Sequence, residues 1–372
     1  MGTLFDYITW RGDLSFDEAP LNEVDSLIFS LLSYVEYKDI VAEHPAADSI
    51  SLQAAALSFT ARNPDPKRVS MGLIVPKDII KLLLAAKECR RFRRIGMKAY
   101  VNHIDLEVQT QFSAVTFCLE NGDTVVAFRG TDDSLIGWKE NFNMSFMDVV
   151  PAQALAKAYL ISAAANCSGG IYVTGHSKGG NLAVYAAMNA PKEVKRRLLG
   201  VWNHDGPGFR LSVLREERYL EIKPLVKTLI PQSSLVGILL EHEESYTVVK
   251  SRQKGAWQHD ALTWEVLGNA FVHVKDIDED SKKTDRALKK WIESLSLEQR
   301  AQFCDALYQT LSSDNALTLT DLISLRNRWI VKGMKLDSEV HQILKHTLTA
   351  LVRANLKNKG EQAASSVKET DQ

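Results

Sequence analysis

Apolar residues recur at helical spacing near the start of the chain and at alternate positions further on. The helical spacing occurs twice, at residues 22–39 and 76–86. Alternation over 111–119 predicts a strand, and Asn121-Gly122 predicts the turn of a hairpin. A short apolar run at 124–128 supplies the returning strand of that hairpin.

After this hairpin, candidate helices and candidate strands alternate along the chain. This order is typical of a mostly parallel sheet with helices on its faces, so the expected fold class is α/β. In chain order the predicted elements are a helix at 151–165, a strand at 171–174, a helix at 178–189, and strands at 199–203 and 226–230.

The same pattern divides the chain into four parts. Residues 1–94 form a helical lead-in that is expected to pack on the core, and residues 95–275 form the α/β core. An acidic run precedes a helical segment at 281–356, whose apolar spacing is amphipathic. Residues 357–372 are polar and lack periodicity, which predicts a disordered tail.

The composition excludes several classes of protein. The chain has 372 residues, 45% of them hydrophobic, which is enough for a substantial core. Its 45 basic and 46 acidic side chains leave a net charge of −1, so bulk charge gives no basis for nucleic-acid binding. The four cysteines are scattered without metal-ligand spacing, so we expect reduced thiols and no metal site. They are Cys89, Cys118, Cys167 and Cys304. The chain has no glycine-rich phosphate loop either, and we expect no cofactor.

The first residues lack the basic and apolar regions of a secretory signal, and Asp6 does not fit a myristoylation motif. The most apolar stretch, 26–35, is far shorter than the roughly 20 residues that cross a bilayer. These features predict a cytoplasmic protein, for which peripheral contact with a membrane stays open. The pattern gives no indication of the oligomeric state.

Two clusters of charge have simple structural interpretations. The basic run at 90–94 suits a solvated helix end better than a phosphate site. The acidic run at 276–280 lacks the glycine and the terminal glutamate spacing of a calcium loop, which favours a solvated linker.

One motif indicates catalysis. Gly175-x-Ser177-x-Gly179 follows an apolar strand and precedes an alanine-rich helix, which is the context of a nucleophile elbow. The turn is so sharp that the serine backbone is strained, and side chains in place of the glycines would collide. The Ser177 hydroxyl would then lie at a helix N-terminus, where the dipole favours developing negative charge. An inert serine in a tight turn is the alternative.

A second element lies upstream of this motif. Residues 125–128 form a strand that ends in the turn Arg129-Gly130-Thr131. Such a turn is suited to donate the backbone N–H of Thr131, with its hydroxyl as a further donor. Together with the N–H of Lys178 it would build an oxyanion hole, in which each donor is typically worth about 3 to 4 kcal/mol. An ordinary loop is the alternative.

These motifs, together with the tryptophan-bearing stretch 136–142, resemble the α/β-hydrolase superfamily and its class 3 triacylglycerol-lipase branch. In that branch a Phe-Arg-Gly-Ser/Thr turn, here residues 128–131, supplies the oxyanion hole. The whole chain, including Asp205-Gly206-Pro207-Gly208, is similar to a bacterial branch classed as a domain of unknown function. The lipase resemblance covers residues 111–259 and implies a hydrolase with the chain order serine, acid, histidine.

The base must be chosen from nine histidines. The implied chain order disfavours those before Ser177, and a direct neighbour of the nucleophile such as His176 points away from it. His259 is the favoured candidate because it lies in a loop before a new helix, where the resembled family also places its histidine. His242 and His273 are the other candidates.

The position of the acid in the sequence differs from that in the resembled family. In class 3 lipases the aspartate follows the second strand beyond the elbow, and Ser234 stands at that position here. Asp205 is the alternative, since it ends the preceding strand in a turn-prone segment. It would accept a hydrogen bond from His259 and stabilise the imidazolium without taking the proton.

The favoured hypothesis is a serine hydrolase that cleaves a small-molecule or lipid ester through an acyl-enzyme. Ser177 attacks, His259 carries the proton and Asp205 orients His259. Residues 134–146 are amphipathic enough for a lid or acyl-binding helix, with a core helix as the alternative. The competing hypothesis is a catalytically inactive binding or scaffold protein of the same fold, which the serine at position 234 supports.

Overall fold

The computed structural model describes residues 1–65, 69, 71, 75–234, 236–279, 281, 282, 292, 294–312, 317, 318 and 321. Most of the predicted helical segment 281–356 and the whole predicted tail 357–372 lie outside these residues. The division of the chain into four parts stays a prediction.

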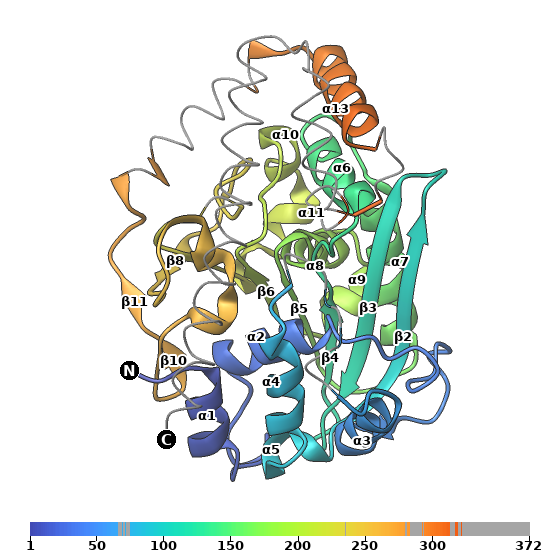
Figure 1. Ribbon diagram of the computed structural model, residues 1–372, viewed down its shortest axis with the longest axis vertical. Helices are drawn as coiled ribbons and strands as arrows, with labels where there is room; N and C mark the ends of the chain where they lie inside the picture. The colour runs from blue at the N-terminus through green and yellow to red at the C-terminus, as the bar shows by residue number, and fades with distance from the viewer. Residues whose placement is uncertain are drawn as a thin grey trace, which may run out of the picture.

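In the described part of the chain, nine strands form one mixed sheet whose spatial order follows the sequence (Figure 1). Neighbours from β4 to β8 are parallel, whereas β1–β3 extend one edge with antiparallel strands and β11 closes the other. The predicted α/β class is therefore confirmed. The strands are β1 (Ile50–Ser51), β2 (Gly96–Asp105), β3 (Thr110–Cys118), β4 (Thr124–Phe128), β5 (Ile171–His176), β6 (Leu198–His204), β7 (Val226–Pro231), β8 (Tyr246–Val249) and β11 (His273–Val274), and β9 (Val266–Leu267) pairs with β10 (Ala270–Phe271) outside this sheet.

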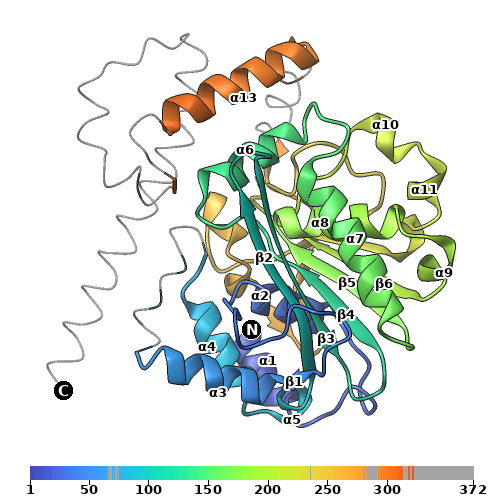
Figure 2. The same cartoon turned by 90° about the vertical axis from the view of Figure 1, so that its right-hand side faces the viewer.

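Helices cover both faces of the sheet. Figure 2 shows the amino-terminal helices on one side of the strands and α7 and α8 on the other. The α-helices are α1 (Leu4–Arg11), α2 (Glu23–Leu32), α3 (Leu52–Arg62), α4 (Asp78–Ala86), α5 (Arg90–Arg93), α6 (Leu135–Asn143), α7 (Pro151–Ala165), α8 (Lys178–Met188), α9 (Lys192–Lys195), α10 (Leu211–Leu214), α11 (Glu217–Leu220) and α13 (Leu297–Leu311), and short 3₁₀ turns span Lys223–Leu225, Gly255–His259 and Ala261–Thr263.

Alternate residues of the central strands face two separate apolar cores. In β4, Val125 and Ala127 belong to the core under the amino-terminal helices, whereas Val126 and Phe128 belong to the core with α7 and α8. Successive side chains of a strand point to opposite faces, so a strand buried on both faces is apolar throughout. This explains the unbroken apolar run at 124–128.

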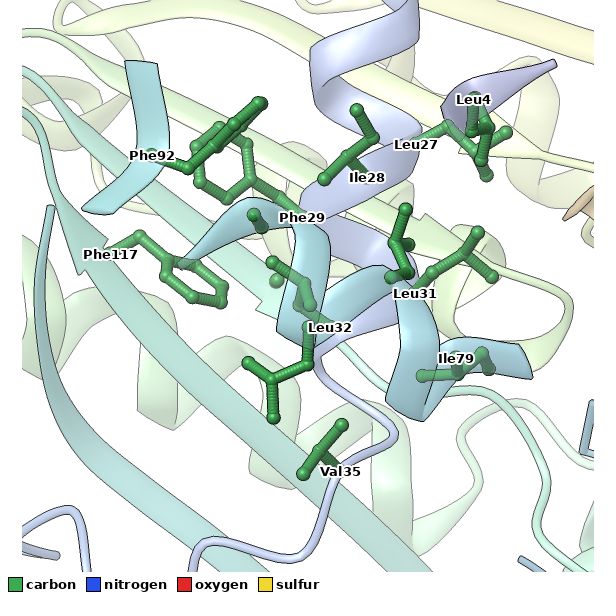
Figure 3. Packing of buried hydrophobic residues seen from close by; sticks show 14 of the residues in the cluster. Leu4, Leu27, Ile28, Phe29, Leu31, Leu32, Val35, Ile79, Phe92 and Phe117 are labelled. Atoms are coloured by element: carbon green, nitrogen blue, oxygen red, sulfur yellow. The ribbon is translucent and has the colours of Figure 1, made fainter. Parts of the chain in front are cut away.

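In the core under the amino-terminal helices, aliphatic side chains pack together with three phenylalanine rings (Figure 3). Phe29 of α2 lies between Phe92 of α5 and Phe117 of β3, with ring centroids 5.6 and 4.9 Å away. The helices of the lead-in thereby pack directly on the sheet. Because α2 also contacts β5, this packing brings the lead-in beneath the strand that carries the nucleophile motif.

Most predicted elements are present, with two informative differences. The helix expected at 22–39 is α2, which begins at the Asn22 cap but ends at Leu32. The strand β2 was not predicted, because a β-bulge with Ala99 at φ 56° interrupts its alternation. A bulge changes which residues face the core, so a period of two cannot be recognised across it.

The basic run at 90–94 is only partly solvated, and the prediction is wrong for Arg91. This side chain is fully buried and binds Asp25 through both its Nε and Nη2 atoms, at 2.8 and 2.6 Å. Its Nη1 atom donates to the carbonyl oxygens of Leu14, Ser15 and Ala19. A guanidinium with this many partners can be buried without an unpaired charge, and it ties α5 to the start of α2.

No helix in the described ranges is long and apolar enough to cross a membrane.

Candidate active site

Ser177 occupies a strained turn between β5 and α8. Its backbone has φ 57° and ψ −134°, a region that costs of order 1–3 kcal/mol for a residue with a side chain. A Cβ atom on Gly175 would lie 2.1 Å from the carbonyl oxygen of Gly179, and one on Gly179 would lie 2.1 Å from that of Phe128. The two glycines are therefore required by close backbone approach, as the motif predicts.

The turn after β4 lies against this elbow. A Cβ atom on Gly130 would stand only 3.0 Å from Ser177 Cβ. Thr131 follows directly, and its Oγ1 accepts a hydrogen bond from Asn141 Nδ2 at 2.8 Å. The N–H of Lys178 opens α8 and has no intrahelical acceptor. Neither this N–H nor that of Thr131 donates to another described residue, so both can serve an oxygen of a bound molecule.

His259 and Asp205 form a short hydrogen-bonded pair. The distance from His259 Nδ1 to Asp205 Oδ2 is 2.6 Å. Asp205 directly follows β6 and is fully buried, whereas the His259 side chain is 21% exposed. The pair joins the carboxyl end of one strand to the 3₁₀ turn Gly255–His259. Because Asp205 occupies Nδ1, Nε2 is the ring nitrogen that stays available for another hydrogen bond.

Ser234 contacts Asp205. Its hydroxyl donates to Asp205 Oδ1 at 2.5 Å, and the N–H of Gly237 donates to the same oxygen at 3.1 Å. A Cβ atom on Gly237 would lie 2.3 Å from this oxygen, so the loop needs a glycine there. The side chain of Ser234 thus binds the carboxylate that follows the neighbouring strand β6.

The family of this chain is shown by its sequence. Residues 86–309, more than half of the chain, match the model of the Mbeg1-like family. The chain belongs to the Mbeg1-like family. Ser177, Asp205 and His259 all lie within the matched residues. No curated protein matches the chain. Among solved structures, the M37 lipase is similar with a TM-score of 0.35 and 15% sequence identity, over 57% of this chain and 68% of that chain.

The other candidate histidines of this Mbeg1-like protein have different partners. His242 contacts Glu244 through Nδ1 and the carbonyl oxygen of Gly237 through Nε2, at 3.1 and 2.7 Å. Both ring nitrogens are therefore occupied, which leaves no base for a substrate. The third candidate, His273, contacts Glu23 at 3.0 Å. Within the described ranges, His259 is the histidine hydrogen-bonded to Asp205.

Most of the stretch 134–146 forms α6 (Leu135–Asn143), which buries Leu135, Ile136 and Glu140, as a core helix does. Glu140 is fully buried and forms an ion pair with Lys178, with 2.9 Å between Oε2 and Nζ. Its carboxylate also accepts from Thr110 Oγ1 and from the N–H groups of Gln111 and Ala152. Opening α6 as a lid would strip a buried charge of all these partners, which is strongly unfavourable.

Sequence reasoning missed this ion pair. Lys178 was singled out only for its backbone N–H, and the two residues lie far apart in the chain. The one local signal is a lysine at the start of an otherwise apolar, alanine-rich helix. In the structure the ion pair fixes the first residue of α8, and with it the proposed oxyanion donor, to α6 and β3.

Replacing Glu140 by glutamine is expected to lower the free energy of unfolding by about 3–5 kcal/mol, because the Lys178 ammonium stays buried without an anion. Denaturant unfolding measures this change. The matched control is Glu120→Gln, since Glu120 faces Arg94 at 3.9 Å on the surface and an exposed pair is worth at most about 1 kcal/mol. An equal and small loss of unfolding free energy in Glu140→Gln and Glu120→Gln would show that the ion pair between Glu140 and Lys178 contributes little to stability.

A pocket lies beside α8 near the elbow. The space open to a water molecule in it is only about 20 Å³. Its wall includes Asn181, four residues after Ser177, and the charged residues Asp148, Arg210 and Arg218. Ser177 itself does not line it. The apolar lining residues are Met144, Met147, Phe209, Val213 and Leu240.

Proposed function

We propose that this protein is a serine hydrolase that cleaves a carboxylic ester through an acyl-enzyme. The observation that carries the proposal is the hydrogen bond at 2.6 Å between the buried Asp205 and His259, beside a strained nucleophile elbow. A histidine held by a buried carboxylate is a general base of fixed tautomer. A tight turn alone would need neither the acid nor the histidine.

Each step of the reaction has a group suited to it. Ser177 Oγ has no hydrogen-bond partner among the described residues, so it is available to attack the ester carbonyl as His259 Nε2 takes its proton. The N–H groups of Lys178 and Thr131 stabilise the oxyanion of the tetrahedral intermediate. Collapse breaks the bond to the alcohol, which leaves with the proton from His259. Water then attacks the acyl-enzyme by the same sequence and regenerates Ser177.

The substrate we propose is a lipid or other small-molecule ester. The proposed acyl transfer takes a carboxylic ester, and the resemblance of residues 111–259 to class 3 lipases favours a lipid ester among these. We propose no cofactor, because the acyl transfer needs only a nucleophile, a base and an oxyanion hole.

A panel of p-nitrophenyl esters from acetate to laurate tests this function. We expect saturable turnover by the wild-type protein, with a preferred acyl length, and loss of turnover in His259→Ala. The control is His103→Ala, because His103 is exposed on β2 and belongs to no proposed step. Equal turnover in the two variants, or none in the folded wild-type protein with any ester, would refute the proposal.

A further inference from the structure

Polar residues connect α2 to the strands beneath it. Ser26 and Ser30 lie four residues apart on one face of α2, and Tyr34 follows in the turn after its end at Leu32. This face otherwise packs in the apolar core under the amino-terminal helices. The contacts are Ser26 Oγ to His204 Nε2 at 2.9 Å, Ser30 Oγ to Thr174 Oγ1 at 2.7 Å, and the Tyr34 hydroxyl to His176 Nδ1 at 3.1 Å.

The last of these contacts continues to the candidate base. His176 Nε2 lies 3.0 Å from the backbone carbonyl oxygen of His259. A carbonyl oxygen only accepts, so Nε2 of His176 carries the proton and Nδ1 accepts from the Tyr34 hydroxyl. Burial, and next the neighbouring His259, lower the pKa of His176 well below its ordinary value, which agrees with a neutral ring.

The rings of His176 and His259 also lie against each other. Their centroids are 4.7 Å apart and their planes differ by 33°. His259 is thus held at three points: Asp205 binds Nδ1, while His176 binds the backbone carbonyl and covers one face of the ring. Tyr34 is buried at the other end of this chain, where a Cβ atom on Gly130 would stand 2.1 Å from its hydroxyl.

We propose that Tyr34 and His176 are positioning residues that hold His259 in register with Ser177 for the ester hydrolysis, so the inference rests on the proposed function. Neither residue donates to the substrate; they act through the backbone and ring face of His259. Tyr34 belongs to the helical lead-in and lies outside the residues that match the family model. The lead-in therefore contributes to the active site as well as to the core.

The size of the effect expected on kcat when Tyr34 is changed follows from the geometry of proton transfer. His259 ends a short 3₁₀ turn and is partly exposed, so its position depends on side-chain contacts. Misplacing a catalytic group by about 1 Å can cost about 100-fold in rate. Tyr34→Phe removes one hydroxyl while keeping the ring, so it loosens His176 without leaving a cavity.

The chain offers a matched control. Tyr37 is also fully buried, but its hydroxyl has no hydrogen-bond partner within the described ranges. Tyr37→Phe therefore makes the same chemical change in the same segment without touching the site.

The first test compares kcat, KM and the thermal midpoint of the two variants on the preferred ester. We expect Tyr34→Phe to lower kcat by about 10- to 100-fold with KM close to that of the wild-type protein, and to lower the thermal midpoint, because the buried His176 Nδ1 loses its donor. Tyr37→Phe should match the wild-type protein in all three. A kcat for Tyr34→Phe equal to that of Tyr37→Phe would overturn the positioning role, whereas absence of wild-type turnover would refute the proposed function instead.

A second test does not depend on turnover. Nitrogen-15 spectra of the histidine-labelled protein at neutral pH should show His176 as the neutral Nε2–H tautomer. In Tyr34→Phe the His176 Nδ1 resonance and the His259 ring resonances should shift, and in Tyr37→Phe they should not. A doubly protonated or Nδ1–H ring in the wild-type protein would contradict the inferred hydrogen-bond chain.

Discussion

Alanine at position 177 is expected to reduce kcat on the preferred ester by about 10⁶-fold, the order seen when the nucleophile of a serine hydrolase is removed. The fold should be unaffected. Ser177 Oγ has no hydrogen-bond partner among the described residues, so its loss leaves no buried group unpaired and should change the free energy of unfolding by at most about 0.5 kcal/mol. Turnover and denaturant unfolding measured on one preparation separate the two effects.

The control for this variant is Ser168→Ala. Ser168 is exposed and precedes β5, at the end of the strand opposite the elbow. It should keep wild-type turnover. If Ser177→Ala kept it as well, the elbow would be a structural turn and the nucleophile would have to be sought elsewhere.

Asparagine at position 205 is expected to lower kcat by about 10⁴-fold, because a neutral amide neither fixes the tautomer of His259 nor stabilises its imidazolium. The geometry permits the substitution, since the side chain is isosteric. The cost should appear in kcat more than in KM, because imidazolium charge develops in the transition state. Steady-state kinetics on the preferred ester measures both constants.

Ser234→Ala distinguishes the acid from its support. This substitution removes one of the three hydrogen bonds given to Asp205 and keeps the carboxylate. We expect kcat to fall about tenfold, which corresponds to about 1.5 kcal/mol for a hydrogen bond to a charged group. An equal fall in kcat in Asp205→Asn and Ser234→Ala would mean that Asp205 is not the acid.

The parts of the fold that could be predicted are those whose signals are local. The apolar run of β4 and the glycines around Ser177 follow from burial and close approach within a few residues. Strand β2 was missed because the bulge at Ala99 breaks its period. The lead-in was predicted to be helical, but its contact with the site could not be, since Tyr34 and His176 meet only after α2 packs on β5.

In the candidate site, too, a local motif was easier to predict than contacts between distant segments. Gly175, Ser177 and Gly179, between an apolar strand and a helix, fit a sharp strand-to-helix turn, so the elbow could be predicted from this local motif. The supporting contacts of Ser234 and Glu140 join distant segments and leave no pattern along the chain. Ser234 in particular looked like a missing acid, whereas its hydroxyl in the structure binds the carboxylate from the next strand.

The central claim is that Ser177 is a nucleophile activated by His259. A fluorophosphonate probe tests it most directly, because such a probe forms a stable adduct only with an activated serine. We expect mass spectrometry of the digested protein to show one adduct, on the peptide that contains Ser177, which disappears in Ser177→Ala and His259→Ala and persists in His103→Ala. No adduct on the folded wild-type protein, or an adduct on another serine, would contradict the claim.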